Sequence, residues 1–389
     1  MTRRAAIVGW AHTPFGKLEE PDVESLIGRV AAAAIDHAGV APADIDAITV
    51  GVYNNGFAKQ GFEAALAALN MPELAYTPAT HLENACATGS AALYAALDSI
   101  ESGRNRIALV IGAEKMTATS NAELGDILLS GCYRKEEAGD SGFAGIFGRI
   151  ADIYFQRHGD RSEELAMIAA KNHAHGVRNP LAHMRKDIGF DFCNRISDKN
   201  PRVAGPLRRT DCSLVSDGAA ALVVADEETA RALNRAIGFR ARRQVNDILP
   251  LSRRDPIAFE GARRAWAKAK EEARVTIDDL DLVETHDCFT IAEMIEYEAM
   301  GLAEPGQGWR VAREGASSRG GRLPINLSGG LKSRGHPLGA TGVSQHVMAA
   351  MQLGGDAGEM QLEGAALAGV FNMGGAAVAN YVSILERVK

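Results

Sequence analysis

Two residues with reactive side chains, Cys86 and His336, lie at the starts of predicted helices in runs of small residues. Cys86 lies in HLENACATGS (81–90), directly before the small, apolar run TGSAALYAALDSI, which is typical of a buried helix. A residue near the first turn of a helix is close to unpaired N–H groups and to the positive end of the helix dipole, and both stabilise a thiolate. Cys86 is therefore either a small core residue or a nucleophile.

His336 lies in the glycine-rich turn SRGHPLGATG (333–342). Pro337 restricts φ, and the glycines on either side permit an unusual backbone that could direct the imidazole into a pocket. A single histidine in a loop is most often solvated. A cysteine together with a histidine, however, is what an activated thiol nucleophile requires.

A third group of polar residues, THDCF (285–289), follows the strand-like run DLDLVE and precedes a predicted helix. Ligands of α/β proteins commonly bind at the carboxyl ends of strands, although His286 and Cys288 could also be ordinary capping residues. These two residues resemble half of a metal site, but no companion pair has ligand spacing. His173 and His175 are expected to face solvent, so we predict no metal.

The sequence NMGGAA (372–377) interrupts a strand-like run near the end of the chain. The two glycines could form only a bulge. They could also leave backbone N–H groups free to hold an oxyanion.

Three segments of the first half resemble three segments of the second half in the same order. The pairs are 41–53 with 276–288, 86–100 with 338–353, and 107–116 with 366–375. Three ordered matches indicate a duplicated fold. In two pseudo-symmetric halves, the loop that carries Cys86 and the loop that carries His336 would meet.

Strand-like and helix-like segments alternate along the chain, which predicts the α/β class with a parallel or mixed sheet covered on both faces. We predict an N-terminal half formed by 1–117 and 206–255, and a C-terminal half formed by 256–389. Residues 118–205 between them are polar and irregular. They are expected to be an inserted domain that forms a lid or ligand wall.

Composition excludes several classes of protein. The 389 residues have a net charge of −7 and no basic stripe, which argues against nucleic acid as a partner. No apolar run approaches the length of a membrane span, and no P-loop or GxGxxG motif is present. The five cysteines form no CxxC pair, so reduced thiols and a cytoplasmic location are expected.

Four motifs in this order, NACATGSAAL, HDCF, GHPLGATG and a terminal glycine-rich strand, resemble the thiolase superfamily. HDCF resembles the sterol-carrier-protein-2-type branch, because other thiolases carry Asn-Glu-Ala-Phe there. The resemblance implies two βαβαβαββ halves in a layered αβαβα arrangement and an inserted loop domain that helps bind coenzyme A. It also implies a homodimer or homotetramer, with coenzyme A as a substrate and no cofactor.

The resemblance also implies roles for individual residues. Cys86 matches the nucleophile that takes the acyl group as a thioester, and His336 matches the histidine that activates this thiol and helps hold the thioester oxygen. His286 lies where other thiolases have the asparagine of an oxyanion hole. Cys288 matches the acid/base that handles the α-proton or the thiol of CoA.

Two further positions are implied more indirectly. Gly374, with the N–H of Cys86, would form the oxyanion hole that faces the acyl-enzyme, and Ser213 matches a position near the pantetheine arm. One position departs from the family pattern. Many thiolases have their acid/base cysteine in a terminal Cys-x-Gly motif, where this chain reads Asn372-Met373-Gly374. Cys288 would then take over that role.

The predicted function is therefore that of a CoA-dependent thiolase, which cleaves 3-ketoacyl-CoA with CoA or runs the reverse Claisen condensation. One alternative is a decarboxylative condensing enzyme that uses Cys86, His286 and His336. Cys288 distinguishes the two, because decarboxylation generates a carbanion without a proton-abstracting base. Another alternative is a non-catalytic carrier or a partner-dependent, aldolase-like relative.

Overall fold

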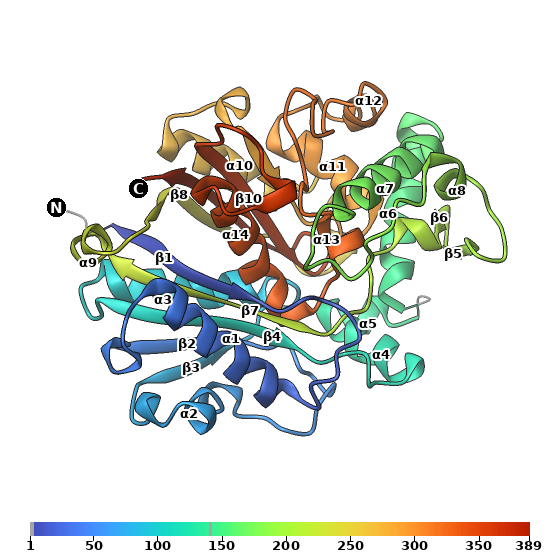
Figure 1. The fold of residues 1–389 in the computed structure, drawn as a ribbon. Coiled ribbons are helices and arrows are strands. Elements are labelled where there is room, and N and C mark those ends of the chain that lie inside the picture. The colour runs from blue at the N-terminus through green and yellow to red at the C-terminus, as the bar shows by residue number, and fades with distance from the viewer. Residues whose placement is uncertain (1–3, 140–141) are drawn as a thin grey trace.

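The computed structural model describes residues 4–139 and 142–389 and shows a mixed nine-stranded sheet with helices on both faces (Figure 1). Its strand order is β3-β2-β4-β7-β1-β8-β11-β10-β9. The strands are β1 Ala5–His12, β2 Ala47–Gly51, β3 Ala79–Leu82, β4 Ile107–Glu114, β7 Gly218–Asp226, β8 Ile237–Asn246, β9 Leu282–Glu284, β10 Leu367–Gly374 and β11 Ala379–Arg387. A separate hairpin pairs β5 Arg202–Ala204 with β6 Leu207–Arg208.

The longer helices are α1 Val23–Ala38, α3 Thr88–Glu101, α4 Asn121–Leu128, α6 Gly142–His158, α7 Ser162–Gly176, α10 Glu260–Ala273, α11 Thr290–Met300 and α14 Leu338–Gly354. The shorter ones are α2 Ala67–Asn70, α5 Arg134–Glu137, α8 Phe190–Asn194, α9 Glu227–Ala232, α12 Gly308–Arg313 and α13 Gly330–Arg334. Local signals set many ends. At α1, for example, the Asp22 side chain accepts a hydrogen bond from Ser25 N–H and the left-handed Gly39 ends the helix.

The two halves of the chain repeat the same strand order, which confirms the predicted duplication. The first half runs β1-β7-β4-β2-β3 from the centre of the sheet to one edge, and the second runs β8-β11-β10-β9 to the other edge. Strand β8 lies within 206–255, the segment predicted for the N-terminal half, but it pairs along its length with β11 of the second half. The counterpart of β3 is reduced to a single parallel bridge between Val283 and Ile325. A short antiparallel contact between β1 and β8 joins the halves.

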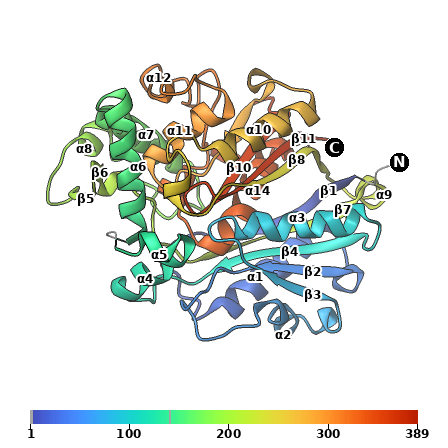
Figure 2. The same ribbon diagram turned by 180° about the vertical axis from the view of Figure 1, so that it is seen from behind.

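Alternating side chains show that the halves form five layers, as the resemblance implies. On β4, Ala108 and Val110 pack in the central cluster with α3 and α14, whereas Leu109 and Ile111 pack in the outer cluster with α1. In the second half, Val370 of β10 likewise faces the central helices, and neighbouring residues face α10 and α11. Figure 2 shows α3 and α14 between the two parts of the sheet.

The central helices α3 and α14 touch through the glycines of the repeated Ala-Thr-Gly step. A Cβ on Gly89 would lie 2.7 Å from the backbone N of Val343, and one on Gly342 would lie 2.3 Å from the backbone N of Ser90. Only glycine permits this approach. The contact brings the start of each helix, and hence the loops that carry Cys86 and His336, to the same place.

Two expectations from the sequence are wrong. Residues 118–205 are largely helical, not irregular, and their helices α6, α7 and α8 lie to one side of the sheet (Figure 1). His173 and His175 are buried, because α7 packs against α11 and α13, and His175 Nδ1 is 3.0 Å from the carbonyl oxygen of Asn326.

Two other properties of the described residues bear on the predictions. None of their helices combines the length and apolar character needed to cross a membrane. No disulfide joins any of their cysteines.

Candidate active site

Cys86 lies in a tight turn between β3 and α3. Ala85 adopts a left-handed backbone with φ of 51°, which is costly for a residue with a Cβ and is maintained only when neighbouring contacts demand it. Those contacts come from Thr88, whose Oγ1 accepts from the N–H of Asn84 at 2.8 Å and donates to the carbonyl of Ala85 at 2.6 Å. The turn therefore holds the Cys86 thiol in one place at the N-terminal end of α3.

The structure brings Cys86, His286 and His336 together. The Sγ atom and one nitrogen of each imidazole all lie within 4.8 Å of one another, and all three residues are buried. The two imidazole rings meet edge to face, with centroids 5.0 Å apart and planes at 82°. His286 comes from the loop between β9 and α11, and His336 from the loop between α13 and α14.

Cys288 lies in the same loop as His286, and Ser213 lies in the segment that precedes β7. The N–H of Ser213 donates to the carbonyl of Cys288 at 2.9 Å, and the N–H of His336 donates to the carbonyl of Leu214 at 3.2 Å. The segment around Ser213 thus ties the Cys288 loop to the His336 loop. The Cys288 thiol is buried, and a charge on Cys86 would further raise the pKa of Cys288.

Backbone N–H groups surround the Cys86 thiol. Burial raises its pKa to about 12, against the lowering effect of hydrogen bonds from the N–H of Gly375 and from its own N–H. The donor thus belongs to Gly375, one residue after the predicted Gly374. Gly374 ends β10 and packs so tightly that a Cβ there would lie 2.4 Å from the carbonyl oxygen of Asn84.

The other titratable groups of the site are also neutral. Burial raises the pKa of the Cys288 thiol well above its usual value. Burial lowers the pKa of His336 to about 3, and that of His286 falls well below its usual value for the same reason. Arg334 adds to both histidine shifts. The resting site therefore contains two thiols and two uncharged imidazoles.

The proton position on His336 follows from its partner. Thr341 Oγ1 donates its only hydrogen to the carbonyl of Pro337 at 2.8 Å and lies 2.7 Å from Nδ1 of His336. Nδ1 must therefore carry the proton and donate to Thr341. This leaves Nε2 of His336 as a bare acceptor, which has no hydrogen-bond partner among the described residues.

Asn372 occupies the position where many thiolases have a cysteine, and its side chain lies between two residues of the site. Its Nδ2 atom is 3.1 Å from the carbonyl oxygen of Cys86 and 2.9 Å from Nδ1 of His286. Its Oδ1 atom accepts from the hydroxyl of Ser90 at 2.7 Å.

Two buried charged residues support the loops and were not predicted from the sequence. Arg334 is fully buried and pairs with Glu284 at 3.2 Å and with the hydroxyl of Ser328 at 2.8 Å. Glu114 accepts from the N–H groups of Tyr53 and Gly339, each at 2.9 Å, and so ties the first half to the His336 loop. Burial raises the Glu114 pKa to about 7.

Among the described residues, Cys86, His286 and His336 are the group whose ligand atoms lie close enough together to hold a metal ion. A ligand histidine offers a bare nitrogen and usually donates its other N–H to a neighbouring acceptor. His336 satisfies this requirement through Thr341. His286 does not, because its Nδ1 atom faces the amide nitrogen of Asn372.

Comparison with known proteins agrees with this geometry. The model of the thiolase N-terminal domain matches residues 5–228, and that of the thiolase C-terminal domain-like family matches residues 244–387. The chain therefore belongs to the thiolase family.

Similar proteins include members of the branch that the HDCF motif indicates. An acetyl-CoA acetyltransferase of Methanothermobacter thermautotrophicus is 34% identical over 388 residues, which cover 99% of this chain and 100% of the relative. Human sterol carrier protein 2 is 32% identical over 399 residues, with 96% of this chain and 70% of the relative covered.

Two solved structures share the fold. A chain of the Ltp2-ChsH2(DUF35) aldolase has a TM-score of 0.83 and 19% identity, and the match covers 99% of this chain and 98% of that one. An acetyl-CoA acetyltransferase from Syntrophomonas wolfei has a TM-score of 0.74 and 19% identity, with both chains fully covered. The predicted thiolase-like fold is confirmed.

Proposed function

We propose that this thiolase-type, CoA-dependent acyltransferase cleaves 3-ketoacyl-CoA with CoA, or runs the reverse Claisen condensation, through a thioester on Cys86. The observation that carries the proposal is the setting of the Cys86 thiol. It lies within 4.8 Å of a ring nitrogen of His336, near a second buried thiol and backbone N–H donors. These are the nucleophile, base, acid and oxyanion donors that acyl transfer requires.

In the first half-reaction, Nε2 of His336 takes the proton of Cys86 as Sγ attacks the 3-keto carbon. The C2–C3 bond then breaks, the acyl group remains on Sγ, and the electron pair leaves on the enolate of acetyl-CoA. The enolate takes the proton of Cys288. The products are acetyl-CoA, acyl-Cys86, a His336 imidazolium and a Cys288 thiolate.

In the second half-reaction, the Cys288 thiolate takes the proton of the CoA thiol, whose sulfur attacks the thioester. The N–H groups of Cys86 and Gly375, close to Sγ, are placed to stabilise the oxyanion. Collapse of the intermediate releases acyl-CoA. The departing sulfur of Cys86 takes its proton back from His336, which restores the resting state.

The proposed CoA site uses the segment around Ser213 and the inserted domain. Residues 178–209 carry eight Lys or Arg side chains against three Asp, in a chain with a net charge of −7. Seven of the eight are exposed, and the eighth, Arg208, is paired with Asp211. A cationic surface of this kind suits the phosphates of CoA.

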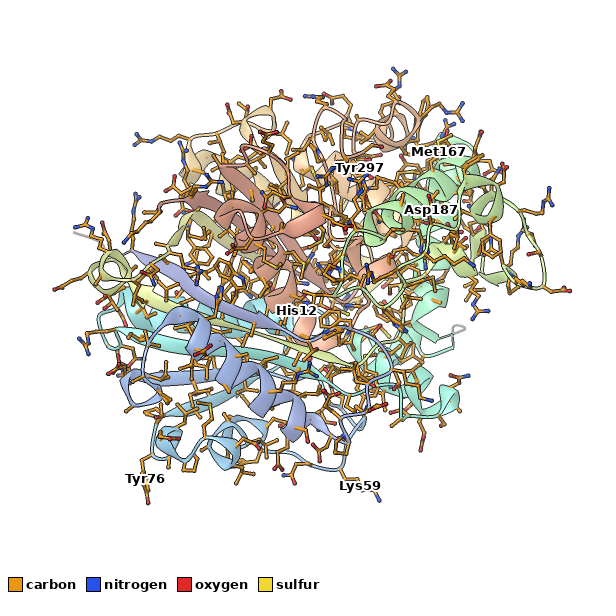
Figure 3. All side chains as sticks on the ribbon, in the orientation of Figure 1. His12, Lys59, Tyr76, Met167, Asp187 and Tyr297 are labelled. Atoms are coloured by element: carbon orange, nitrogen blue, oxygen red, sulfur yellow. The ribbon has the colours of Figure 1, made fainter. Side chains whose placement is uncertain are left out.

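We also propose a homodimer formed through the edge strand β3. Its residues Ala79, Thr80 and His81 are exposed, so one side of the strand has no pairing partner within the described residues. Exposed edges of this kind are normally covered. Phe62 and Tyr76 beside the edge are 82% and 105% exposed, and Tyr76 points away from the molecule (Figure 3).

The dimer is tested by light scattering coupled to size-exclusion chromatography on wild type and on a Phe62→Glu/Tyr76→Glu double variant. We expect a dimer for the wild type and a monomer with an unchanged circular dichroism spectrum for the variant. A wild-type monomer, or a variant that stays dimeric, would contradict the proposal.

A decarboxylative condensing enzyme is the second candidate, because Cys86, His286 and His336 form the required Cys-His-His set. Acid-quenched mass spectrometry after mixing with a panel of 3-ketoacyl-CoAs separates the two. We expect an acyl adduct on Cys86 whose mass follows the substrate, and no turnover by Cys86→Ala. Near-normal turnover by that variant would exclude the covalent route, and a strict requirement for malonyl-CoA would favour the second candidate.

A further inference from the structure

We propose that Asn372 is a positioning residue that holds His286 with its proton on Nε2, so that His286 donates a hydrogen bond into the site while His336 accepts one. This inference deepens the proposed function and rests on it. It also assigns a role to the residue that stands in place of the family cysteine.

The orientation of the Asn372 amide follows from its neighbours. The carbonyl oxygen of Cys86 can only accept, so the amide atom 3.1 Å from it must be the NH₂ group. The hydroxyl of Ser90 donates to the other amide atom, Oδ1, which agrees with this orientation.

The same NH₂ group sets the proton on His286. One of its hydrogens points to Cys86, and the second points to Nδ1 of His286 at 2.9 Å. Nδ1 must then present its lone pair. Because a neutral imidazole carries one proton, that proton lies on Nε2.

The protonated Nε2 of His286 is a buried donor without a partner among the described residues. Such groups are rare because they lose their hydrogen bonds to water, and they are explained when a ligand supplies the acceptor. Nε2 of His336 is likewise buried and without a partner, but its proton lies on the far nitrogen, beside Thr341. Two neighbouring histidines of the Cys86 site thus carry opposite functions on their unpartnered ring nitrogens.

This difference has a chemical use. As Sγ of Cys86 attacks a carbonyl, one group must take the thiol proton and another must stabilise the negative oxygen. The bare nitrogen of His336 suits the first task and the N–H of His286 suits the second. The side chain of a cysteine at position 372 could not donate two hydrogen bonds, so it could not connect Cys86 and His286 in this way.

The test that does not depend on activity is ¹⁵N NMR of the full-length protein labelled with ¹⁵N-histidine, in which protonated and bare ring nitrogens have different shifts. Comparison with His286→Asn assigns the signals. We expect Nε2–H for His286 in the wild type and Nδ1–H in Asn372→Asp, whose carboxylate accepts a hydrogen bond. Nδ1–H in the wild type would overturn the proposal, whatever the activity. If the tautomer is as expected but no CoA thioester reacts, the proposed function fails instead.

The kinetic test uses Asn372→Leu, which has a similar volume and no donor. We expect kcat to fall about 10²- to 10³-fold with little change in KM, as for the loss of one oxyanion donor. In a His286→Asn background, where an amide can donate by itself, the same change should cost only a few-fold. An equal loss in both backgrounds would mean that Asn372 acts through another residue, and would overturn the proposal.

Discussion

Alkylation of Cys86 should reveal that the resting site holds a neutral thiol and not a thiolate–imidazolium pair. The thiol pKa of about 12 and the His336 pKa of about 3 lie about nine units apart. At about 1.4 kcal/mol per unit, moving the proton from Cys86 to His336 in the empty site costs on the order of 12 kcal/mol before the attraction between the two new charges is counted. Within 4.8 Å and at an effective dielectric constant of about 20, that attraction returns only about 3 kcal/mol. The ion pair is therefore negligibly populated before substrate binds.

The assay is iodoacetamide treatment of the wild-type protein between pH 5 and about pH 10, followed by mass spectrometry of the peptide that contains Cys86. Only the thiolate reacts. Because the folded-state pKa is raised, the thiolate fraction should increase about tenfold per pH unit across this range, with no plateau. The control is His336→Asn, which should abolish turnover but change the alkylation rate by no more than a few-fold, since the resting thiol does not depend on the imidazole for ionisation.

A different profile would refute the reasoning. A rate that is constant between pH 5 and 8, and that collapses in His336→Asn, is the behaviour of a preformed thiolate–imidazolium pair. In that case the burial of Cys86 would not dominate its ionisation, and His336 would act before substrate binds.

Two further predictions concern the acid and the helix contact. Cys288→Ala should lose thiolysis yet still form acyl-Cys86 in acid-quenched samples that receive acyl-CoA, and the absence of this adduct would argue against a role limited to proton transfer. Gly342→Ala should lower the free energy of unfolding by about 1–3 kcal/mol, because the new Cβ would lie 2.3 Å from the backbone N of Ser90. Gly125→Ala, on a helix with nothing within 4 Å, should instead raise it by up to about 1 kcal/mol. Urea denaturation measures both, and equal effects would contradict the packing argument.

The layered fold and the meeting of Cys86 with His336 could be predicted from the sequence. The sequence pattern is local and repeated: apolar strands alternate with helices, and the Ala-Thr-Gly step recurs near the start of two of those helices. A duplicated fold places equivalent loops about one pseudo-twofold axis, so two reactive residues at equivalent positions must approach each other. No contact had to be known for that inference.

Local sequence patterns did not predict the structure of the inserted domain, because the buried surface of its helix α7 is polar. His173 and His175 are expected from the sequence to face solvent. Both are buried because α7 packs against polar parts of the C-terminal half, where Lys171 pairs with Glu293 and Asn172 donates to Asp287. Polarity alone could not distinguish such a helix from a loop.

The sequence by itself determined which side chains are available for chemistry, because three motifs place a cysteine or histidine just after a strand or just before a helix. Only the tertiary structure decided which ring nitrogen of each histidine carries the proton and which one accepts a hydrogen bond. The proton of His336 is set by Thr341, five residues away, but that of His286 is set by Asn372, 86 residues away, which also contacts Cys86 across 286 residues. A tautomer depends on the hydrogen-bond partner of the opposite ring nitrogen, and that partner is chosen by the packing of distant segments.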